Sequence, residues 1–509
     1  MKILRQAPFI RLVLFLIIGI IFQTYSDFSL NLLQIICVFS IIIVGVAFIP
    51  TISRNYNLRY LFGIALFLLC FSVGGLLTDY CWKNTEWNES QGLKTYQAQI
   101  IDEPVRKPKT WMCKVSLNNG KKAIIYIPLD TLSSTLIPGD ILEISADFTP
   151  VEQSYIKKQG IAARSFIRKG DWHKIKNVSE TKFNLRFQAL KYRRILLDRL
   201  KILIPDSRSY SVAAALIFGY KNELDPVTRQ TFAATGTAHV LAVSGLHFSI
   251  IYGMFYFLFS FLGNSLRGRI IRQLIILPLM WVFAFLTGLG PSVVRAAIML
   301  SVWGIGSAFF VKAFTVNTLS IAAFLMLLYN PLYLFDVGFQ LSFSAVFAIL
   351  MINPFLIGLY ETQNRILQYL WGLCTVSTSA QVGTAPLSIY YFHQFPLIYF
   401  VTNIFAIPIV GVLLFLIPVS LLLQFLLGNY SIIMYPVNKL LLFFISGLES
   451  LERIPNALVS NIDLTRMDVF SMSLFIIFFF LLVIKKRVAY LYSLIIVAVF
   501  QLFYYLCRL

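Results

Sequence analysis

Charged residues are scarce in this sequence: they occupy 13% of its 509 positions, while hydrophobic residues occupy 58%. Charged residues make up about 25% of an ordinary soluble domain, so the composition excludes that class and indicates a membrane protein. Apolar runs of about 17–25 residues, the length that crosses a hydrocarbon core, recur along the chain. We expect an α-helical polytopic membrane protein with roughly a dozen spans.

Cysteine and histidine are also rare, which leaves little material for a metal centre or a disulfide framework. The six cysteines are scattered without a Cys-x-x-Cys pair, and only Cys81 and Cys113 leave the question of a disulfide open. The four histidines are His173, His239, His247 and His393. The sequence also lacks a Gly-x-x-x-x-Gly-Lys-Ser/Thr loop, which excludes that type of ATP site. We expect no metal and no cofactor.

The excess of basic residues predicts the orientation of the chain. The net charge is +20, and basic residues mark the cytoplasmic loops of membrane proteins. The relevant loops contain Lys2, Arg5, Arg54, Arg59, Arg267, Arg269, Arg272, Lys312, Lys485, Lys486 and Arg487. Counting spans from an inside N-terminus places these loops inside and residues 81–238 outside. The first apolar run has no small-x-small cleavage site after it, so we expect it to be retained as a span.

Residues 81–179 differ in composition from the rest, because short alternating runs replace the long apolar ones. Residues 111–117 alternate before an Asn-Asn-Gly turn, and residues 123–127 complete a predicted hairpin. Further strands are predicted at 141–148 and 161–167. About five strands indicate a small β domain outside the membrane, such as an OB-like barrel, with a small sandwich as the alternative.

Basic residues are concentrated between positions 157 and 201. The first of them are Lys157, Lys158, Arg164, Arg168 and Lys169. Residues 183–200 combine apolar residues at helical spacing with Lys and Arg, and we expect basic, amphipathic, interfacial helices within 180–235. Two interpretations stay open: anchoring to anionic lipid headgroups, or attraction of nucleic-acid phosphates to the entrance of a channel.

Polar residues inside the apolar regions are costly and therefore indicate function. They form four motifs, at 236–247, 288–296, 336–344 and 381–403. The candidate residues are His239, Ser244, Gly245, His247, Ser292, Arg295, Gln340, Ser342, Gln381, His393 and Asn403. The predicted topology gathers these motifs at the outer mouth of a bundle. On one continuous helix, His239 and His247 would lie roughly 80° apart and face one cavity.

Each motif also has a purely structural interpretation. Small residues such as Gly236 and Gly245 are common at helix contacts in membranes, and two histidines without a third ligand make a poor metal site. Ser244 and His247 have the spacing of a nucleophile and a base, but no acidic residue lies nearby to orient the base, which argues against a hydrolase. Arg295 is better explained by an anion inside the bundle than by the charge bias of loops.

At these residues the sequence resembles the ComEC family of competence proteins, the inner-membrane channels for DNA uptake in natural transformation. The resemblance rests on the run from Thr235 to His247 and on later landmarks in the family's order. These landmarks are Pro291-Ser292, Arg295-Ala296, Asn330-Pro331, Phe339 to Ser344, Pro386, Phe395, Asn403 and Pro408. The resemblance implies membrane spans at 1–80, an OB-like domain at 81–179 and a channel bundle at 236–509.

Longer family members continue into a metallo-β-lactamase-like domain with a His-x-His-x-Asp-His type cluster, thought to degrade the strand that is not transported. This sequence has no such cluster, so we expect no enzyme activity from it.

The resemblance implies that single-stranded DNA crosses the cytoplasmic (inner) membrane past Arg295, His239 and His247. Its further partners would be the lipid bilayer, a cytoplasmic ATP-driven translocase and an outer DNA receptor, and a homo-oligomer stays open. Aromatic residues of the β domain would stack bases; the candidates are Trp111, Tyr126, Tyr155, Phe166 and Trp172. The alternative function is transport of another anionic solute or of a lipid-linked intermediate.

Overall fold

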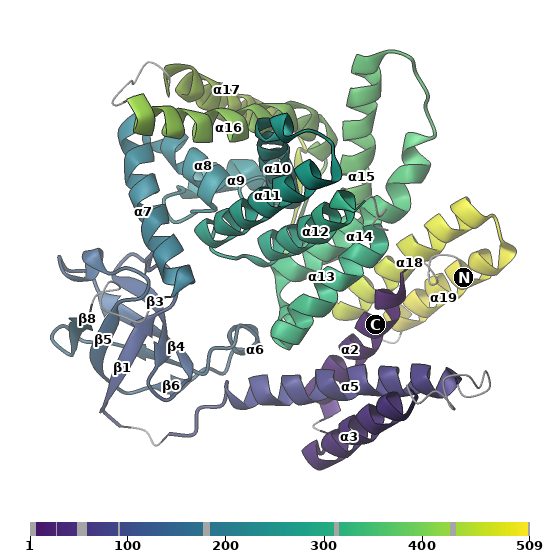
Figure 1. Cartoon of the computed structure of the whole chain (residues 1–509), viewed down its shortest axis with the longest axis horizontal. Helices are drawn as coiled ribbons and strands as arrows, with labels where there is room; N and C mark the ends of the chain where they lie inside the picture. The colour runs from purple at the N-terminus through teal and green to yellow at the C-terminus, as the bar shows by residue number, and fades with distance from the viewer. Residues whose placement is uncertain are drawn as a thin grey trace. The chain divides into compact units, whose positions relative to one another are not determined.

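The computed structural model of the protein describes residues 7–26, 28–47, 59–89, 92–176, 184–309, 315–427 and 434–506. Predictions for Lys2, Arg5, Arg54 and Lys312 lie outside these residues, as do those for the side chains of Arg59 and Tyr155. The chain divides into two compact units. Unit 1 is Met1–Leu196 with Leu262–Asp336, and unit 2 is Leu197–Phe261 with Val337–Leu509. Figure 1 labels their elements.

Most described residues are helical, and among them eight helices are long and apolar enough to cross a membrane. They are α2 (Pro8–Ser26), α3 (Leu30–Ala47), α5 (Arg59–Lys83), α11 (Leu266–Leu286), α12 (Pro291–Ala308), α14 (Val337–Ile357), α16 (Tyr399–Leu427) and α18 (Arg466–Lys485). Shorter apolar stretches lie in α10 (Gly245–Leu258), α13 (Thr315–Tyr329) and α19 (Val488–Leu506). These are the helices of a multi-span membrane protein, as the composition predicted.

In unit 1, the helices α2, α3 and α5 pack together at one end of the chain. A Cβ atom on Gly19 would lie 2.1 Å from the carbonyl oxygen of Phe71, and one on Gly74 would lie 2.5 Å from that of Leu16. Residues without side chains therefore let the backbones of α2 and α5 touch, a common device in membrane helices. The helices α11, α12 and α13 pack in chain order, and α12 begins at Pro291 as predicted.

Unit 1 also contains a mixed, eight-stranded sheet. Its strands are β1 (Lys94–Ile100), β2 (Val105–Arg106), β3 (Thr110–Leu117), β4 (Lys122–Pro128), β5 (Ile141–Ala146), β6 (Thr149–Pro150), β7 (Ala163–Phe166) and β8 (Trp172–Lys176). The order is β6-β7-β4-β3-β1-β5-β8, and β2 pairs with β3. The β4–β7 pair is parallel, whereas β1, β3 and β5 make antiparallel pairs. The predicted hairpin is confirmed as β3 and β4.

The sheet has more strands than the five expected from the sequence. Two of them, β2 and β6, have only two residues each, which is too short for an alternating pattern to appear. The run that follows the helix α6 (Ser154–Lys157) is divided into β7 and β8 on either side of Gly170, whose φ is +98°. The sequence pattern detected only the first part of this run.

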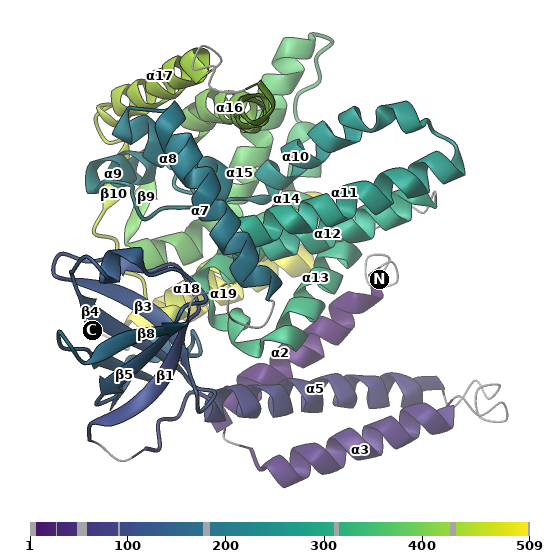
Figure 2. The same cartoon turned by 60° about the vertical axis from the view of Figure 1, so that its left-hand side comes forward.

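The strands wrap around an apolar interior (Figure 2). Cys113 is fully buried there, and this burial raises the pKa of its thiol to about 12. Cys113 and Cys81 are both free cysteines, which answers the question of a disulfide in this structure. Trp172 is 7% exposed and belongs to the same core, so its proposed role in base stacking is wrong.

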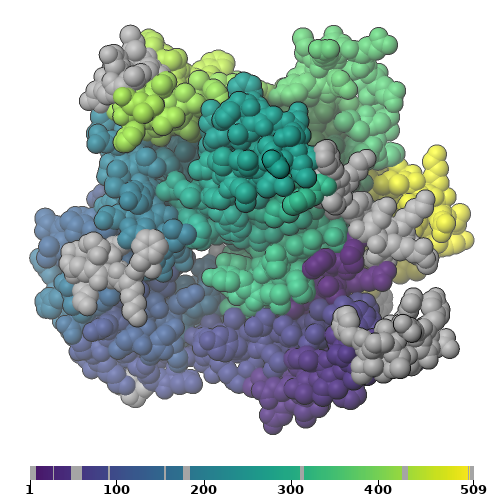
Figure 3. Space-filling view, in the orientation of Figure 1, coloured from purple at the N-terminus to yellow at the C-terminus, as the bar shows by residue number. Residues whose placement is uncertain are grey.

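Unit 2 consists of helices and one small sheet. Besides α10, α14, α16, α18 and α19 it contains α8 (Ser207–Phe218), α9 (Pro226–Ala234), α15 (Arg365–Phe392), α17 (Met434–Glu452), β9 (Gln394–Pro396) and β10 (Leu458–Ser460). The helices α14 and α15 form a hairpin whose surface is the green area at the upper right of Figure 3. The helix α16 contacts α8, α10, α15 and α17, and its residues Ala406, Val410 and Leu413 are fully buried.

Candidate functional site

The motif at 236–247 is a loop followed by the start of a helix. The chain leaves α9 after Ala234, turns at Gly236 with a φ of +78°, and enters α10 at Gly245. His239 lies in the loop and His247 in the first turn of α10. The expectation that both histidines share one helical face is therefore wrong, because His239 lies in the turns between α9 and α10 and only His247 is helical.

Ser244 and His247 are used to begin α10. The backbone N–H of Ser244 donates to Nδ1 of His247 at 3.4 Å, and the hydroxyl of Ser244 lies 2.9 Å from the same nitrogen. This pairing of the residue before a helix with the third helical residue is a capping box. His247 is 1% exposed, so the spacing that suggests a nucleophile and a base has a structural explanation here.

His239 is held by a contact with the backbone of its own loop. Its Nδ1 lies 3.0 Å from the carbonyl oxygen of Gly236. Because a carbonyl only accepts, Nδ1 carries the proton in this contact and Nε2 is left as an acceptor. The exposed ring of His239 thus has a fixed tautomer and position.

The Gly236 loop packs on residues from the fourth motif. A Cβ atom at position 236 would lie 3.0 Å from Cγ of Pro396 and 3.1 Å from Cβ of Tyr399. Pro396 belongs to β9, which pairs with β10 in the register Leu458 to Pro396 and Ser460 to Gln394. The loop and the β9 segment, distant in sequence, therefore form one structure within unit 2.

His393 ends α15 in the left-handed conformation, with a φ of 56°. Its Nδ1 lies 3.0 Å from Oδ1 of Asp463 and 3.3 Å from the carbonyl oxygen of Ile462. Both side chains are largely exposed. His393 therefore joins the end of α15 to the segment that follows β10.

The third motif contacts the fourth motif within the α14–α15 hairpin. The hydroxyl of Tyr391 on α15 donates to Oε1 of Gln340 on α14 at 2.8 Å. Ser342 and Gln381 are partly buried on the same two helices. Asn403 on α16 is 7% exposed, and its Oδ1 makes no hydrogen bond to the residues that the structure describes. Three of the four polar motifs thus lie in unit 2, where packing joins the first motif to the fourth and a hydrogen bond joins the third to the fourth. We call these motifs, at 236–247, 337–344 and 381–403, the polar cluster of unit 2.

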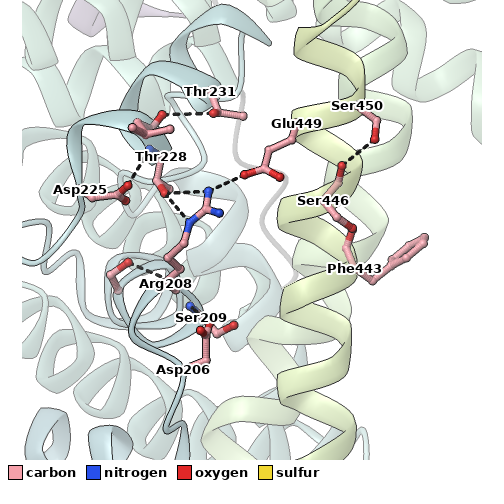
Figure 4. Close-up of polar contacts among 12 residues, drawn as sticks. Asp206, Arg208, Ser209, Asp225, Thr228, Thr231, Phe443, Ser446, Glu449 and Ser450 are labelled. Atoms are coloured by element: carbon pink, nitrogen blue, oxygen red, sulfur yellow. Dashed lines mark hydrogen bonds and ion pairs between the residues drawn. The ribbon is translucent and has the colours of Figure 1, made fainter.

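An ion pair holds the helices beside the loop. Arg208 at the start of α8 lies 2.5 Å from Glu449 of α17, and its Nη2 lies 3.4 Å from Oγ1 of Thr228 on α9 (Figure 4). This contact with Glu449 raises the pKa of Arg208. Asp206 and Asp225 cap α8 and α9, and the hydrogen bonds from Ser209 lower the pKa of Asp206. Arg208 therefore links three helices, one of which leads into the Gly236 loop.

The second motif lies in unit 1. Arg295 is 5% exposed in the second turn of α12, and Ser292 is partly buried in its first turn. The turn before α12 contains Gly288, and a Cβ atom there would lie 3.2 Å from Nη1 of Arg193. Arg193 belongs to α7 (Leu185–Leu203) and forms an ion pair with Glu103. The turn at 288, the part of α7 up to Leu196 and the loop after β1 therefore meet in unit 1.

The helix α7 confirms the helix expected over 183–200, but its apolar positions are divided. Phe187, Leu190 and Leu200 are buried in the protein, whereas Leu185 and Ile195 are exposed. Arg186 lies 2.5 Å from Asp102. Part of the basic stretch is therefore neutralised by carboxylates, which the sequence interpretation did not foresee.

The outward face of β3, β4 and β7 carries aromatic and basic residues. The rings of Tyr126 and Phe166 are stacked, with centroids 4.6 Å apart and an angle of 14° between their planes. Phe166 is 69% exposed, and Arg164 is exposed two residues before it on the same face. Trp111, another candidate, instead packs against the core. Two other residues of the basic stretch, Arg168 and Lys169, are exposed. The Nζ atom of Lys158 instead lies 5.0 Å from the centroid of the Phe335 ring.

Sequence reasoning missed several partners in these contacts, namely Asp102, Glu103, Arg208, Tyr391, Glu449 and Asp463. For the acidic partners, a signal was available: carboxylates are rare in this chain, so each one was a candidate partner for a basic residue. Among the described residues no group of three or more His, Cys, Asp or Glu side chains could hold a metal ion.

The comparisons with known proteins agree on a family. The profile of the Competence protein family matches residues 216–488, which include the polar cluster of unit 2 and Arg295. The chain is 30% identical over 234 residues to ComE operon protein 3 of Bacillus subtilis, a stretch that covers 46% of this chain and 29% of that relative. It is 26% identical over 212 residues to Recombination protein 2 of Haemophilus influenzae, covering 39% of this chain and 26% of that relative.

An uncharacterized protein of Aquifex aeolicus is 30% identical over 247 residues, covering 47% of this chain and 56% of that relative. The chain therefore spans between about a quarter and little more than half of the length of these relatives. No solved structure matches the chain at a significant level. Because the family profile covers more than half of the sequence, the chain belongs to the competence protein family.

Proposed function

We propose that this protein takes part in DNA uptake for natural transformation by conducting single-stranded DNA across the cytoplasmic membrane. The observation that carries the proposal is the family match, which covers the polar cluster of unit 2 and Arg295. A buried arginine in a membrane helix is costly, and such residues face the interior of a helix bundle or a water-filled cavity and pair with one another or with backbone carbonyls. A phosphodiester chain is an anion, and a cation along its path would neutralise part of its charge.

The pairing of the strands supports an OB-type barrel as the place where DNA first binds. The strand β1 pairs with β3 and β5, β3 with β4, β4 with β7, and β5 with β8. The strands β7 and β8 follow one another in the chain, and both point in the same direction as β4. Because β7 lies near one end of the sheet order and β8 lies at the other end, this segment connects the two ends of the sheet. OB-folds bind oligonucleotides on one outward face of the barrel, and the stacked rings of Tyr126 and Phe166 lie on the outward face of β4 and β7. Stacking on an exposed ring such as that of Phe166 tolerates any base sequence.

The proposal also includes the partners that transport requires. The sequence contains no phosphate-binding loop, so in this proposal the energy for movement comes from a cytoplasmic ATP-driven translocase or from a potential across the membrane. An outer receptor would deliver the DNA. In this proposal the chain conducts the strand and does not cut it.

Arg295 provides the test. In a naturally transformable host whose own family member has been deleted, this chain should restore transformation, and Arg295→Gln should lower its frequency at least tenfold. Arg295→Lys should retain more activity, because it keeps the charge. Arg267→Gln, which removes an exposed arginine of unit 1, is the matched control.

The amount of each variant in the membrane is measured alongside transformation frequency and DNase-resistant DNA. Full uptake by Arg295→Gln at normal membrane levels would refute a role for this residue in the DNA path. If the unaltered chain restores nothing but vesicles containing it take up small anionic solutes, the transport of another anion is the correct function.

A further inference from the structure

We propose that Arg186 and Lys114 form a binding site for a single phosphodiester, and that the carboxylate of Asp102 occupies this site when no DNA is bound. The inference rests on the proposed function and adds a means of regulation: an internal carboxylate competes with DNA for the same two cations. All three residues belong to unit 1.

Two cations from different elements converge on one carboxylate. Nη2 of Arg186 on α7 lies 2.5 Å from Oδ1 of Asp102, and Nζ of Lys114 on β3 lies 3.6 Å from Oδ2. Asp102 itself lies in the loop after β1. Each carboxylate oxygen therefore contacts one cation. A phosphodiester carries the same single charge on two oxygens, so it can bridge the same pair.

The cations are not saturated by Asp102. Two positive charges and one negative charge leave the group with a net charge of +1. Nε of Arg186 is buried and makes no hydrogen bond to the residues that the structure describes. An arginine can donate two parallel hydrogen bonds to a phosphate, and Asp102 receives only one from Arg186. The site thus retains both charge and a donor for a second anion oxygen.

Exposure indicates that Asp102 can leave. The side chains of Arg186, Lys114 and Asp102 are 35%, 38% and 39% exposed. Ion pairs with this exposure are weak, since water and salt compete with them. The adjacent pair of Arg193 and Glu103 is different, because its side chains are only 8% and 12% exposed. Breaking a buried pair is costly, so Glu103 keeps the loop attached to α7 while Asp102 exchanges.

The site adjoins the stacked rings. In the register of the sheet, Lys114 pairs with Ile124 and Ile124 with Arg164, while Tyr126 pairs with Phe166. Lys114, Tyr126 and Arg164 alternate with residues of the main core and lie on its outward face. On that face a second apolar cluster of Ile124, Val151 and Ile161 packs against Tyr126, whereas Phe166 is 69% exposed. The row with Lys114 and Arg164 is two residues, roughly 7 Å, from the row of the rings. A strand whose base stacks on the exposed ring of Phe166 can therefore place a phosphate at Lys114 and Arg186.

The test measures binding of a fluorescent 20-nucleotide oligothymidine to the full chain in nanodiscs. Asp102→Asn should bind at least threefold more tightly than the unaltered chain, because it frees both cations. Its affinity should also fall more steeply with salt, since more phosphates are neutralised. Glu152→Gln is the matched control, because it removes one exposed carboxylate from the same sheet domain.

The double variant Asp102→Asn with Arg186→Gln separates a local site from a general effect of charge. If the gain comes from Arg186, the second substitution cancels it. An oligothymidine with an uncharged methylphosphonate backbone should show no gain with Asp102→Asn. Thermal unfolding of each variant shows whether the domain stays folded, and Asp102→Ser replaces Asp102→Asn if that variant unfolds.

The inference is overturned if Asp102→Asn binds no more tightly than Glu152→Gln, or if its gain persists in the double variant. These results leave the proposed function intact, provided that the unaltered chain binds the oligonucleotide. Absence of binding by the unaltered chain and by every variant would instead refute the proposed function, and the inference with it.

Discussion

At the scale of single residues, Gly236 determines how the candidate cluster in unit 2 is assembled. Its φ of +78° lies in the left-handed region, and its missing side chain allows Pro396 and Tyr399 to pack on the loop. Both requirements select glycine. The turn at Gly236 also sets the direction of the loop, which contains His239 and leads to the capping pair of Ser244 and His247.

We expect Gly236→Ala to destabilise the protein by about 1–3 kcal/mol, because a side chain here meets both backbone strain and two close neighbours. The control is Gly253→Ala in α10, where a Cβ atom would meet nothing within 4 Å. Alanine is the better helix former by about 1 kcal/mol, so this variant should be neutral or slightly more stable. Thermal unfolding in detergent distinguishes them; equal stability of both variants would contradict the packing described for Gly236.

The residue scale also shows what the sequence could and could not predict. Ser244, His247 and Arg295 stood out because polar residues are rare in apolar runs. The contact between Ser244 and His247 is local, three residues apart, whereas contacts between residues far apart in the chain were not predictable. Gln340 and Tyr391 are 51 residues apart, and Arg208 and Glu449 are 241 residues apart. The turn at Gly236 could have been suspected from the glycine itself, but its φ depends on neighbours that only the fold provides.

At the scale of elements, close contact between α14 and α15 depends on Gly383. A Cβ atom there would lie 2.1 Å from Cβ of Ala348 and 3.1 Å from the carbonyl oxygen of Ser344. Small residues at such positions allow membrane helices to approach closely. The contact keeps Gln340 beside Tyr391.

Gly383→Leu should separate the two helices and reduce both folded yield and DNA uptake at least severalfold. Gly372→Leu on the same helix should have little effect, because a Cβ atom at that position has nothing within 4 Å. Resistance to limited proteolysis and transformation frequency are the two measurements. If Gly383→Leu tolerates proteolysis as well as Gly372→Leu does, the contact is not needed for the hairpin.

Elements with a strong periodic pattern were predicted well, and the others were not. The hairpin of β3 and β4 alternates over its whole length, and α12 begins with a proline at its first position. The strands β9 and β10 have three residues each, which is too short for a pattern, and they exist because the segments after α15 and α17 pair with each other. Such strands depend on tertiary contacts and not on local propensity.

At the scale of the whole molecule, the distribution of basic residues predicts which side of the membrane each segment faces. In a chain whose natural cysteines are replaced, Glu152→Cys should react with an impermeant maleimide added to intact cells. Arg267→Cys should react only after the membrane is opened. Both positions are exposed, so access to reagent is limited only by the membrane.

Labelling of Arg267→Cys in intact cells would reverse the predicted orientation and would place the sheet domain on the cytoplasmic side.

The family could be recognised from the sequence because its motifs lie within 216–488. The composition, in turn, gave the membrane class without any motif. The expected count of roughly a dozen spans stays a prediction, because eight described helices are long and apolar enough to cross. Shorter apolar helices such as α13 have only 15 residues, and length alone does not show whether they cross.

The parallel pairing of β4 with β7 has a consequence for the order of synthesis. The strands β1, β3, β4 and β5 can pair as soon as residue 146 has been made, but the free edges of β4 and β5 find their partners only within residues 163–176. Until then two open strand edges are exposed, and such edges invite pairing with other chains. A ribosome that stalls before Ala163 would therefore release a sheet prone to aggregation, although β1, β3, β4 and β5 would already be present.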